Sequence, residues 1–151
     1  MHRTAIDPEL AVLAQRGRTL VVAVTTSGSV DQSERALLDA CQRAGVATRI
    51  VAGSADAIAL VPRVGTVDRI LVFGGPVETT VLHIAMQLGA QARTVGIIWD
   101  ACHGGSALTL DVTRDRATQA GVIPYTLAAC MAELGLSFTA ATSPRRFSEV
   151  A

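Results

Sequence analysis

The sequence predicts a three-layer α/β/α sandwich with a Rossmann-like, mostly parallel five-stranded sheet. Short apolar, β-branched runs alternate with amphipathic helical patterns, and short loops join them. Strands that alternate with helices in this way form right-handed crossovers, which make a parallel sheet. Half of the residues are hydrophobic but only 3% are aromatic. A core of Val, Leu, Ile and Ala suits a sheet that helices cover on both faces.

The first half of the chain contains clear helix and strand signals. Asp7 and Pro8 match an N-cap followed by the first helical position. The run TLVVAV has the continuous apolar, β-branched pattern of a central strand. Gly45 ends the helix that follows this strand. The predicted elements are a helix over 7–16, a strand over 19–24, a polar turn over 25–29, a helix over 31–44, a strand over 47–52, and a short helix or turn over 54–64.

The second half repeats the alternation. The apolar run RILVF leads through Gly-Gly-Pro into a helix, and Gly121 and Gly135 end later helices. The predicted elements are a strand over 69–73, a helix over 77–91, a strand over 94–99, a loop over 100–106, a helix over 108–120, an edge strand over 122–125, and a helix over 126–134.

Length and charge limit the kind of protein this is. A chain of 151 residues is long enough for one domain with a sizeable core. We expect that domain over residues 1–142 and a C-terminal tail over 143–151. The formal net charge is zero, which argues against nucleic-acid and anionic-membrane partners. No apolar run has the length needed for a membrane span.

The cysteines and the first loop argue against a metal or a cofactor. Cys41, Cys102 and Cys130 lack metal-ligand spacing, and their odd number without a signal peptide predicts reduced thiols in the cytoplasm. The loop TTSGS at 25–29 lacks the Gly-x-Gly-x-x-Gly pattern, and the chain has no Lys for a P-loop. We therefore expect no metal ion and no cofactor.

The segment RILVFGGPVETTVLHIAMQ at 69–87 resembles the isochorismatase-like cysteine hydrolases. In that family a similar strand ends in Gly, a turn with a Glu follows, and the nucleophilic Cys opens the helix, often before Val-Leu-His. On this pattern Glu78 matches the Glu, 81–83 matches Val-Leu-His, and Thr80 stands at the nucleophile position. The runs IIWDAC and AGVIPYTLAACMAELG also resemble the family, so the resemblance covers about 19–135 and implies a shortened member.

The residues that carry the family reaction are absent. The family uses a Cys thiolate, an Asp at the end of the first strand and a Lys, whereas this chain has Thr80, Thr25 and no Lys. A Thr hydroxyl needs a strong adjacent base to act as a nucleophile. The family's cis peptide, after which an N–H binds the oxyanion, falls on Gly75 and Pro76, and Pro76 has no N–H. We therefore do not expect the usual cysteine-hydrolase reaction.

Three other side chains are candidates for acid–base catalysis. His83 lies one helical turn beyond Thr80. Asp100 and His103 follow a strand, so we expect them at the same sheet edge as Thr25. Each has a structural alternative, because His83 fits a packed helix face and Asp100 fits a loop residue held by hydrogen bonds.

Candidate binding residues surround the same edge. The hydroxyl-rich loop at 25–29 resembles a small anion-binding loop. Ser27 or Ser29 as a helix N-cap explains the loop as well. Trp99 either lines a pocket or fills the core. The candidate substrate-binding residues are Thr25, Thr26, Ser27, Gly75, Pro76, Glu78, Trp99 and Cys102.

Three functions remain open at the level of sequence. In the first, an isochorismatase-like protein without the Asp/Lys/Cys triad binds a small polar metabolite or a partner at the C-terminal rim of the sheet. In the second, the same rim is an active hydrolase- or lyase-type site with non-cysteine chemistry. In the third, the chain is a structural dimerisation module. Family members are commonly oligomers, so the resemblance implies a homodimer or a higher homo-oligomer. Turnover separates the first two, and an ordered rim pocket separates both from the third.

Overall fold

A computed structural model of the protein contains one sheet of five parallel strands in the order β2-β1-β3-β4-β5. This confirms the predicted fold class. The structure describes residues 12, 15–25, 30–53, 55–56, 59, 67–90, 94–104 and 106–137. The strands are β1 (Thr19–Val24), β2 (Ala47–Val51), β3 (Arg69–Phe73), β4 (Thr94–Ile98) and β5 (Ile123–Tyr125).

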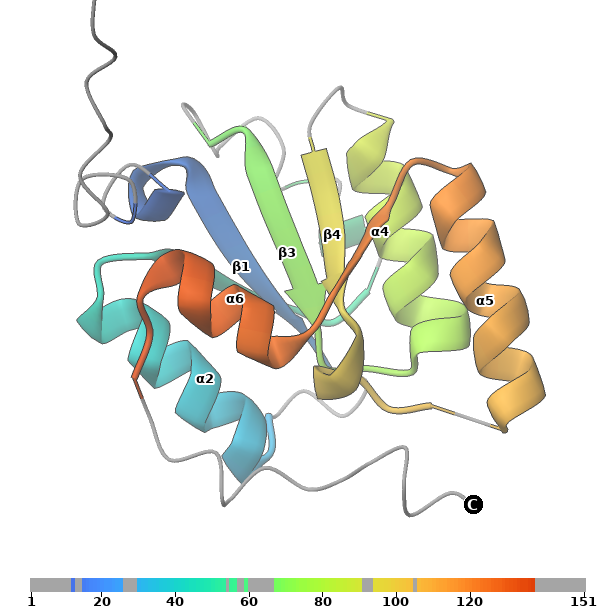
Figure 1. Ribbon diagram of the computed structural model, residues 1–151, viewed down its shortest axis with the longest axis horizontal. Helices are drawn as coiled ribbons and strands as arrows, with labels where there is room; N and C mark the ends of the chain where they lie inside the picture. Colours follow the sequence, from blue (N-terminus) through green and yellow to red (C-terminus); the bar gives the residue numbers. More distant parts are fainter. Residues whose placement is uncertain are drawn as a thin grey trace, which may run out of the picture.

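Helices cover both faces of the sheet (Figure 1). They are α2 (Gln32–Arg43), α4 (Leu82–Gly89), α5 (Ala107–Gln119) and α6 (Leu127–Leu134), with a π-helical turn η2 (Val77–Val81) before α4 and a short 3₁₀ turn η3 (Trp99–Ala101) after β4. The chain steps from β1 to β2 in one direction and from β3 to β4 and β5 in the other. Right-handed crossovers therefore place α2 on one face and α4 and α5 on the opposite face, and α6 returns to the α2 side (Figure 1).

The core lies around the two central strands. Every residue of β1 and of β3 is buried, whereas β2 at the edge is mostly exposed. This explains why the sequences of the central strands are continuous apolar runs rather than alternating ones. Among the described residues, no helix is long and apolar enough to cross a membrane.

The N-terminal ends of the strands are held by a buried arginine. Arg69, the first residue of β3, donates from Nε to Thr19 Oγ1 at 3.1 Å and forms an ion pair with Glu133 of α6. Its guanidinium carbon also lies 5.8 Å from the centre of the Tyr125 ring. This network, for which the sequence carries no local signal, ties α6 to the first residues of β1 and β3 and to the Tyr125 ring of β5.

The main correction concerns the start of α2. The N-cap is Asp31, and neither Ser27 nor Ser29 takes that role. Asp31 Oδ1 accepts from the Glu34 N–H at 2.8 Å, and Glu34 Oε1 accepts from the Asp31 N–H at 2.9 Å. This is a capping box, in which each side chain satisfies a backbone N–H at the helix terminus.

Smaller differences occur at other boundaries. The strand predicted over 94–99 ends at Ile98, because Trp99 begins the 3₁₀ turn. The helix predicted over 77–91 starts as a π-helical turn and ends at Gly89. Residues 12, 15–18, 55–56 and 59 are helical, but the predicted helix start at Asp7 and most of the segment 54–64 lie outside the described residues. Thr26, Ser27 and the tail 143–151 also lie outside them.

Candidate functional site

The carboxyl ends of β1 and β3 form the topological switch point of the sheet. From β1 the chain continues to α2 on one face, and from β3 it continues through η2 to α4 on the other (Figure 1). Loops that leave adjacent strands in opposite directions open a crevice between them, and ligands of open α/β sheets bind there. The residues at this position are therefore the first to consider as a site.

A glycine turn follows β3 at the crevice. Gly74 has a φ of +110°, and a Cβ at this residue would lie 2.7 Å from the carbonyl oxygen of Val24. The same Cβ would lie 3.3 Å from Glu34 Oε2. The missing side chain thus lets the end of β1 and a carboxylate from α2 approach the turn. The bond between Gly75 and Pro76 is trans, since the described part of the chain contains no cis peptide bond.

Backbone hydrogen bonds join this turn to the loop after β4. The Gly74 N–H donates to Ala101 O at 3.1 Å, and the His103 N–H donates to Gly75 O at 3.1 Å. The Val77 N–H donates to His103 O at 2.8 Å. The first N–H after Pro76 is therefore occupied by the protein itself, and the backbone of His103 is fixed at both its N–H and its carbonyl.

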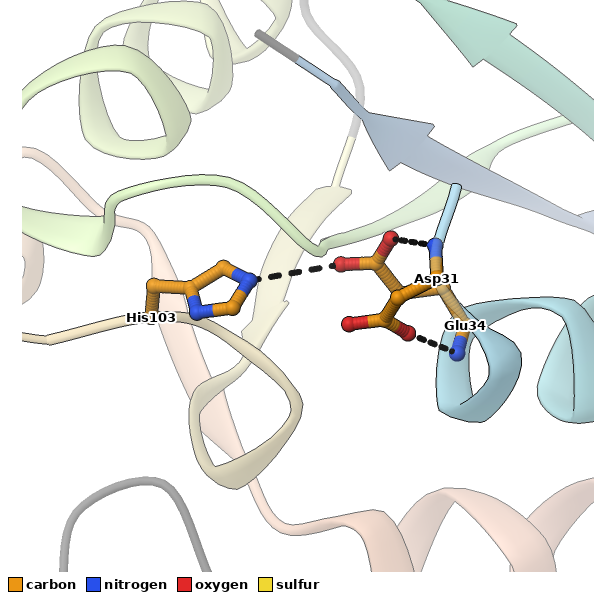
Figure 2. A group of neighbouring side chains, drawn as sticks. All are labelled: Asp31, Glu34 and His103. Atoms are coloured by element: carbon orange, nitrogen blue, oxygen red, sulfur yellow. Dashed lines mark hydrogen bonds and ion pairs between the residues drawn. The ribbon is translucent and has the colours of Figure 1, made fainter. Parts of the chain in front are cut away.

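Three potential metal ligands converge beside the turn (Figure 2). One ligand atom from each of Asp31, Glu34 and His103 lies within 4.8 Å of the others. His103 Nε2 is 3.7 Å from Glu34 Oε2, and the Glu34 side chain is only 7% exposed. A carboxylate that is almost fully buried is uncommon in proteins unless it is paired. We refer to these three residues as the carboxylate–histidine cluster.

A separate pocket of about 500 Å³ lies beside the start of the helix after β3. Hydroxyl, imidazole, carboxylate and guanidinium groups share its wall with apolar side chains. The lining residues are Gly53, Glu78, Thr79, Thr80, Leu82, His83, Met86 and Arg116. The structure thus brings together Glu78, Thr80 and His83 from the sequence prediction. We refer to this cavity as the rim pocket.

Other predicted site residues have structural partners elsewhere. Asp100 Oδ1 accepts from the Leu127 N–H at 2.7 Å, which places the carboxylate at the start of α6. The Cys102 thiol is buried and donates to Ile98 O at 3.4 Å. Cys102 and the neighbouring His103 therefore have different partners, Ile98 O and Glu34. Thr25 is 5% exposed, and its N–H donates to the carbonyl of Val51 in the edge strand.

Trp99 is the first residue of the 3₁₀ turn after β4 and is 6% exposed. The Arg114 guanidinium carbon is 5.3 Å from the centre of the indole ring, within the range of a cation–π interaction. The indole N–H is buried without a hydrogen-bond partner among the described residues. Trp99 was expected either to line a pocket or to fill the core, and its burial favours core filling.

Three ionisable residues of the two sites were not predicted from the sequence: Asp31, Glu34 and Arg116. Asp31 and Glu34 carry a detectable signal, because Asp-x-x-Glu before an apolar run is a capping-box pattern. That pattern marks a helix start, and nothing in it places Glu34 beside His103. Arg116 carries no local signal, since it comes from a helix distant in sequence and reaches the rim pocket only through the fold.

The buried thiols of Cys41 on α2 and Cys130 on α6 are unreactive at neutral pH. Burial raises the pKa of Cys41 and of Cys130 to about 12. At neutral pH both are thus protonated, and a thiol rather than a thiolate is a poor nucleophile. Neither residue substitutes for the missing nucleophile.

Comparisons with known proteins support the fold assignment. Neither the known family models nor the curated protein sequences include a match to this chain. Among solved structures, MAR1 ribonuclease from Caenorhabditis elegans matches with a TM-score of 0.59 and 17% identity, over 89% of this chain and 88% of that one. This neighbour has the isochorismatase-like α/β fold. At such low identity the match shows a shared fold alone.

Proposed function

We propose that the protein binds a small metabolite with an anionic group and an apolar body in the rim pocket. The observation that carries the proposal is the pocket itself, which has a volume of about 500 Å³ and is lined by Arg116, two threonines and apolar side chains. Cavities of roughly 300–1,000 Å³ with a few polar groups on an apolar wall are typical of small-molecule sites.

The charge in the pocket favours an anion. Arg116 is exposed and forms no ion pair with any described residue. A guanidinium binds carboxylates and phosphates through paired N–H groups. Thr79 and Thr80 add hydroxyls in the first turn of η2, where backbone N–H groups also favour negative charge. Glu78 lies on the same wall and favours a ligand that also carries a hydrogen-bond donor.

Several features support binding without the family's hydrolase reaction. Thr80 stands at the nucleophile position, Thr25 is buried, and Pro76 offers no N–H. The next N–H, that of Val77, is bonded to His103 O. Loss of one oxyanion donor typically lowers the rate by about 10²- to 10³-fold. We therefore propose that the protein has lost the Asp/Lys/Cys chemistry and kept a ligand site.

Binding of benzoate and of its neutral analogue benzamide, measured by titration calorimetry, tests this function. We expect benzoate to bind more tightly, because Arg116 interacts with the carboxylate. Arg116→Gln should remove this preference, and Arg35→Gln on exposed α2 is the matched control. Equal binding of the two probes, or an unchanged preference in Arg116→Gln, would contradict the proposal.

Acid–base catalysis is a second candidate, favoured by one observation. Thr80 and His83 line the same pocket, and His103 lies beside a buried carboxylate at the switch point. A hydrolase- or lyase-type reaction would draw its acid and base from His83, His103 or Asp100. The release of nitrophenol from 4-nitrophenyl acetate tests this candidate. The wild type is compared with the His83→Ala and His103→Ala variants. The candidate requires that the wild type hydrolyses the ester and that one of the two variants does not.

A further inference from the structure

We propose that Asp31, Glu34 and His103 bind a divalent transition-metal ion of the Zn²⁺ or Mn²⁺ class. This inference does not depend on the proposed function, because none of the three residues lines the rim pocket. Two carboxylates and one imidazole are a common ligand set for such ions. From the cysteine spacing and the local motifs we expected no metal, because the three ligands come together only in the folded chain.

The geometry allows the three groups to share one ion. Their ligand atoms lie within 4.8 Å of one another, and the side chains point toward a common centre (Figure 2). Metal–ligand bonds from imidazole and carboxylate are about 2.0–2.2 Å, so ligands on opposite sides of one ion are at most about 4.4 Å apart. Side-chain movements that shift the ligand atoms by a few tenths of an ångström to about 1 Å would therefore bring all three to coordination distance.

On each carboxylate one oxygen accepts a cap hydrogen bond and the other faces the His103 side (Figure 2). The capping box uses Asp31 Oδ1 and Glu34 Oε1. The second oxygen of Glu34 faces His103 Nε2 at 3.7 Å, and the second oxygen of Asp31 points to the same side (Figure 2). The cap hydrogen bonds hold both carboxylates in place, so ion binding requires little additional ordering.

The burial of Glu34 adds to the argument for a cation. Its side chain is only 7% exposed and lies against the Gly74 backbone beside a second carboxylate. A cation between two neighbouring carboxylates lowers their mutual repulsion, and this effect is larger where one of them is buried. The backbone of His103 is fixed by hydrogen bonds to Gly75 and Val77, so the imidazole is already positioned opposite this oxygen.

Metal binding by the full-length, chelator-treated protein tests the proposal, with Zn²⁺ in calorimetry and Mn²⁺ in electron paramagnetic resonance as probes. We expect one ion per chain. Glu34→Gln, Asp31→Asn and His103→Gln should each weaken binding by about 100-fold or more, because even residues that only support a ligand typically contribute about 10- to 100-fold. Gln and Asn preserve the capping box and the N-cap, so these variants should remain folded.

Matched controls separate this site from the rim pocket and from the thiols. Asp39→Asn on α2 and His83→Gln in the pocket should leave metal affinity unchanged. Failure of benzoate binding with intact metal binding would reject the proposed function alone. The metal proposal is overturned by absence of stoichiometric binding, by unchanged affinity in Glu34→Gln and His103→Gln, or by a thiolate charge-transfer band in the Co²⁺-loaded protein.

Discussion

The properties of single residues at the switch point depend on how closely the backbone approaches them. Gly74 combines a positive φ with a space that Val24 O and Glu34 Oε2 already occupy. A side chain there would meet both the backbone strain and a steric clash. The glycine is therefore required by the packing of β1 against the turn, and not only by the shape of the turn.

Gly74→Ala should lower the free energy of unfolding by about 1–3 kcal/mol, the usual cost of a strained backbone conformation, with the clash adding to it. Urea denaturation measures the change. Gly121→Ala is the matched control, because Gly121 has a φ of +81° but open space where its Cβ would lie. An equal loss of unfolding free energy in both variants would show that the steric contact with Val24 contributes nothing to the cost.

Asp100 shows how an apparent catalytic residue can have a structural partner. Its carboxylate accepts from the Leu127 N–H at the start of α6. Asp100→Ala should lower the free energy of unfolding by about 0.5–2 kcal/mol, as for other helix-terminus carboxylates. Asp115→Ala on the exposed side of α5 serves as a control and should change stability little. Unaltered stability of Asp100→Ala, measured by urea unfolding, would show that the hydrogen bond contributes nothing.

At the scale of elements, helix starts decide where side chains arrive at the rim. Asp31 begins α2 through the capping box, and Thr126 begins α6 by accepting from the Ala129 N–H at 3.1 Å. The N-cap of α2 also sets the position of Glu34, which reaches the Gly74 turn. Element boundaries at the carboxyl edge thus determine the composition of the site.

Asp31→Ala should cost about 1 kcal/mol of unfolding free energy, whereas Asp31→Asn should cost only a few tenths, because Asn also caps helices well. Thermal and urea unfolding of the two variants measure the difference. Asp31→Asn should nevertheless weaken metal binding, so stability and metal affinity respond differently to the same substitution. Equal destabilisation by Ala and Asn would contradict the assignment of Asp31 as the N-cap.

The elements were more predictable than the site. Continuous apolar runs such as TLVVAV identify central strands, because both faces of those strands are covered. Gly45, Gly121 and Gly135 mark helix ends through their positive φ values. By contrast, Glu34 meets His103 across a long stretch of sequence, and Arg116 reaches the pocket from α5. No local pattern encodes such tertiary meetings, so sequence reasoning found the rim but only part of its residues.

At the scale of the whole molecule, buried thiols link stability to alkaline pH. Burial raises the folded-state pKa of Cys41 and Cys130 from 9.0 to about 12. The unfolded chain therefore loses these protons first as pH rises. The stabilisation is complete below about pH 9 and declines between about pH 9 and 12.

We expect the free energy of unfolding to fall above pH 9 with a slope of up to about 1.4 kcal/mol per pH unit for each thiol. Urea unfolding from pH 7 to 11 measures the slope. In a Cys41→Ala/Cys130→Ala variant the plateau should be lower, because the core loses volume, but the slope above pH 9 should be reduced. An unchanged slope would show that other groups cause the alkaline loss.

Two exposed apolar side chains on α5 form a candidate surface for self-association. Most apolar residues of α4 are buried in the core of the domain, whereas Leu108 and Val112 on α5 are 74% and 53% exposed. We propose that a homodimer, if formed, uses this face of α5.

The central claim is that the rim pocket beside η2 is a small-molecule site. A titration of the ¹⁵N-labelled protein with benzoate, followed by two-dimensional NMR, tests it most directly. We predict saturable shifts concentrated in the amides of residues 78–86 and around Arg116, because the segment 78–86 contains six of the pocket's lining residues and Arg116 is another. Benzamide should give weaker shifts at the same amides. Shifts centred on the opposite edge around Arg69, or no saturable shifts at millimolar benzoate, would contradict the claim.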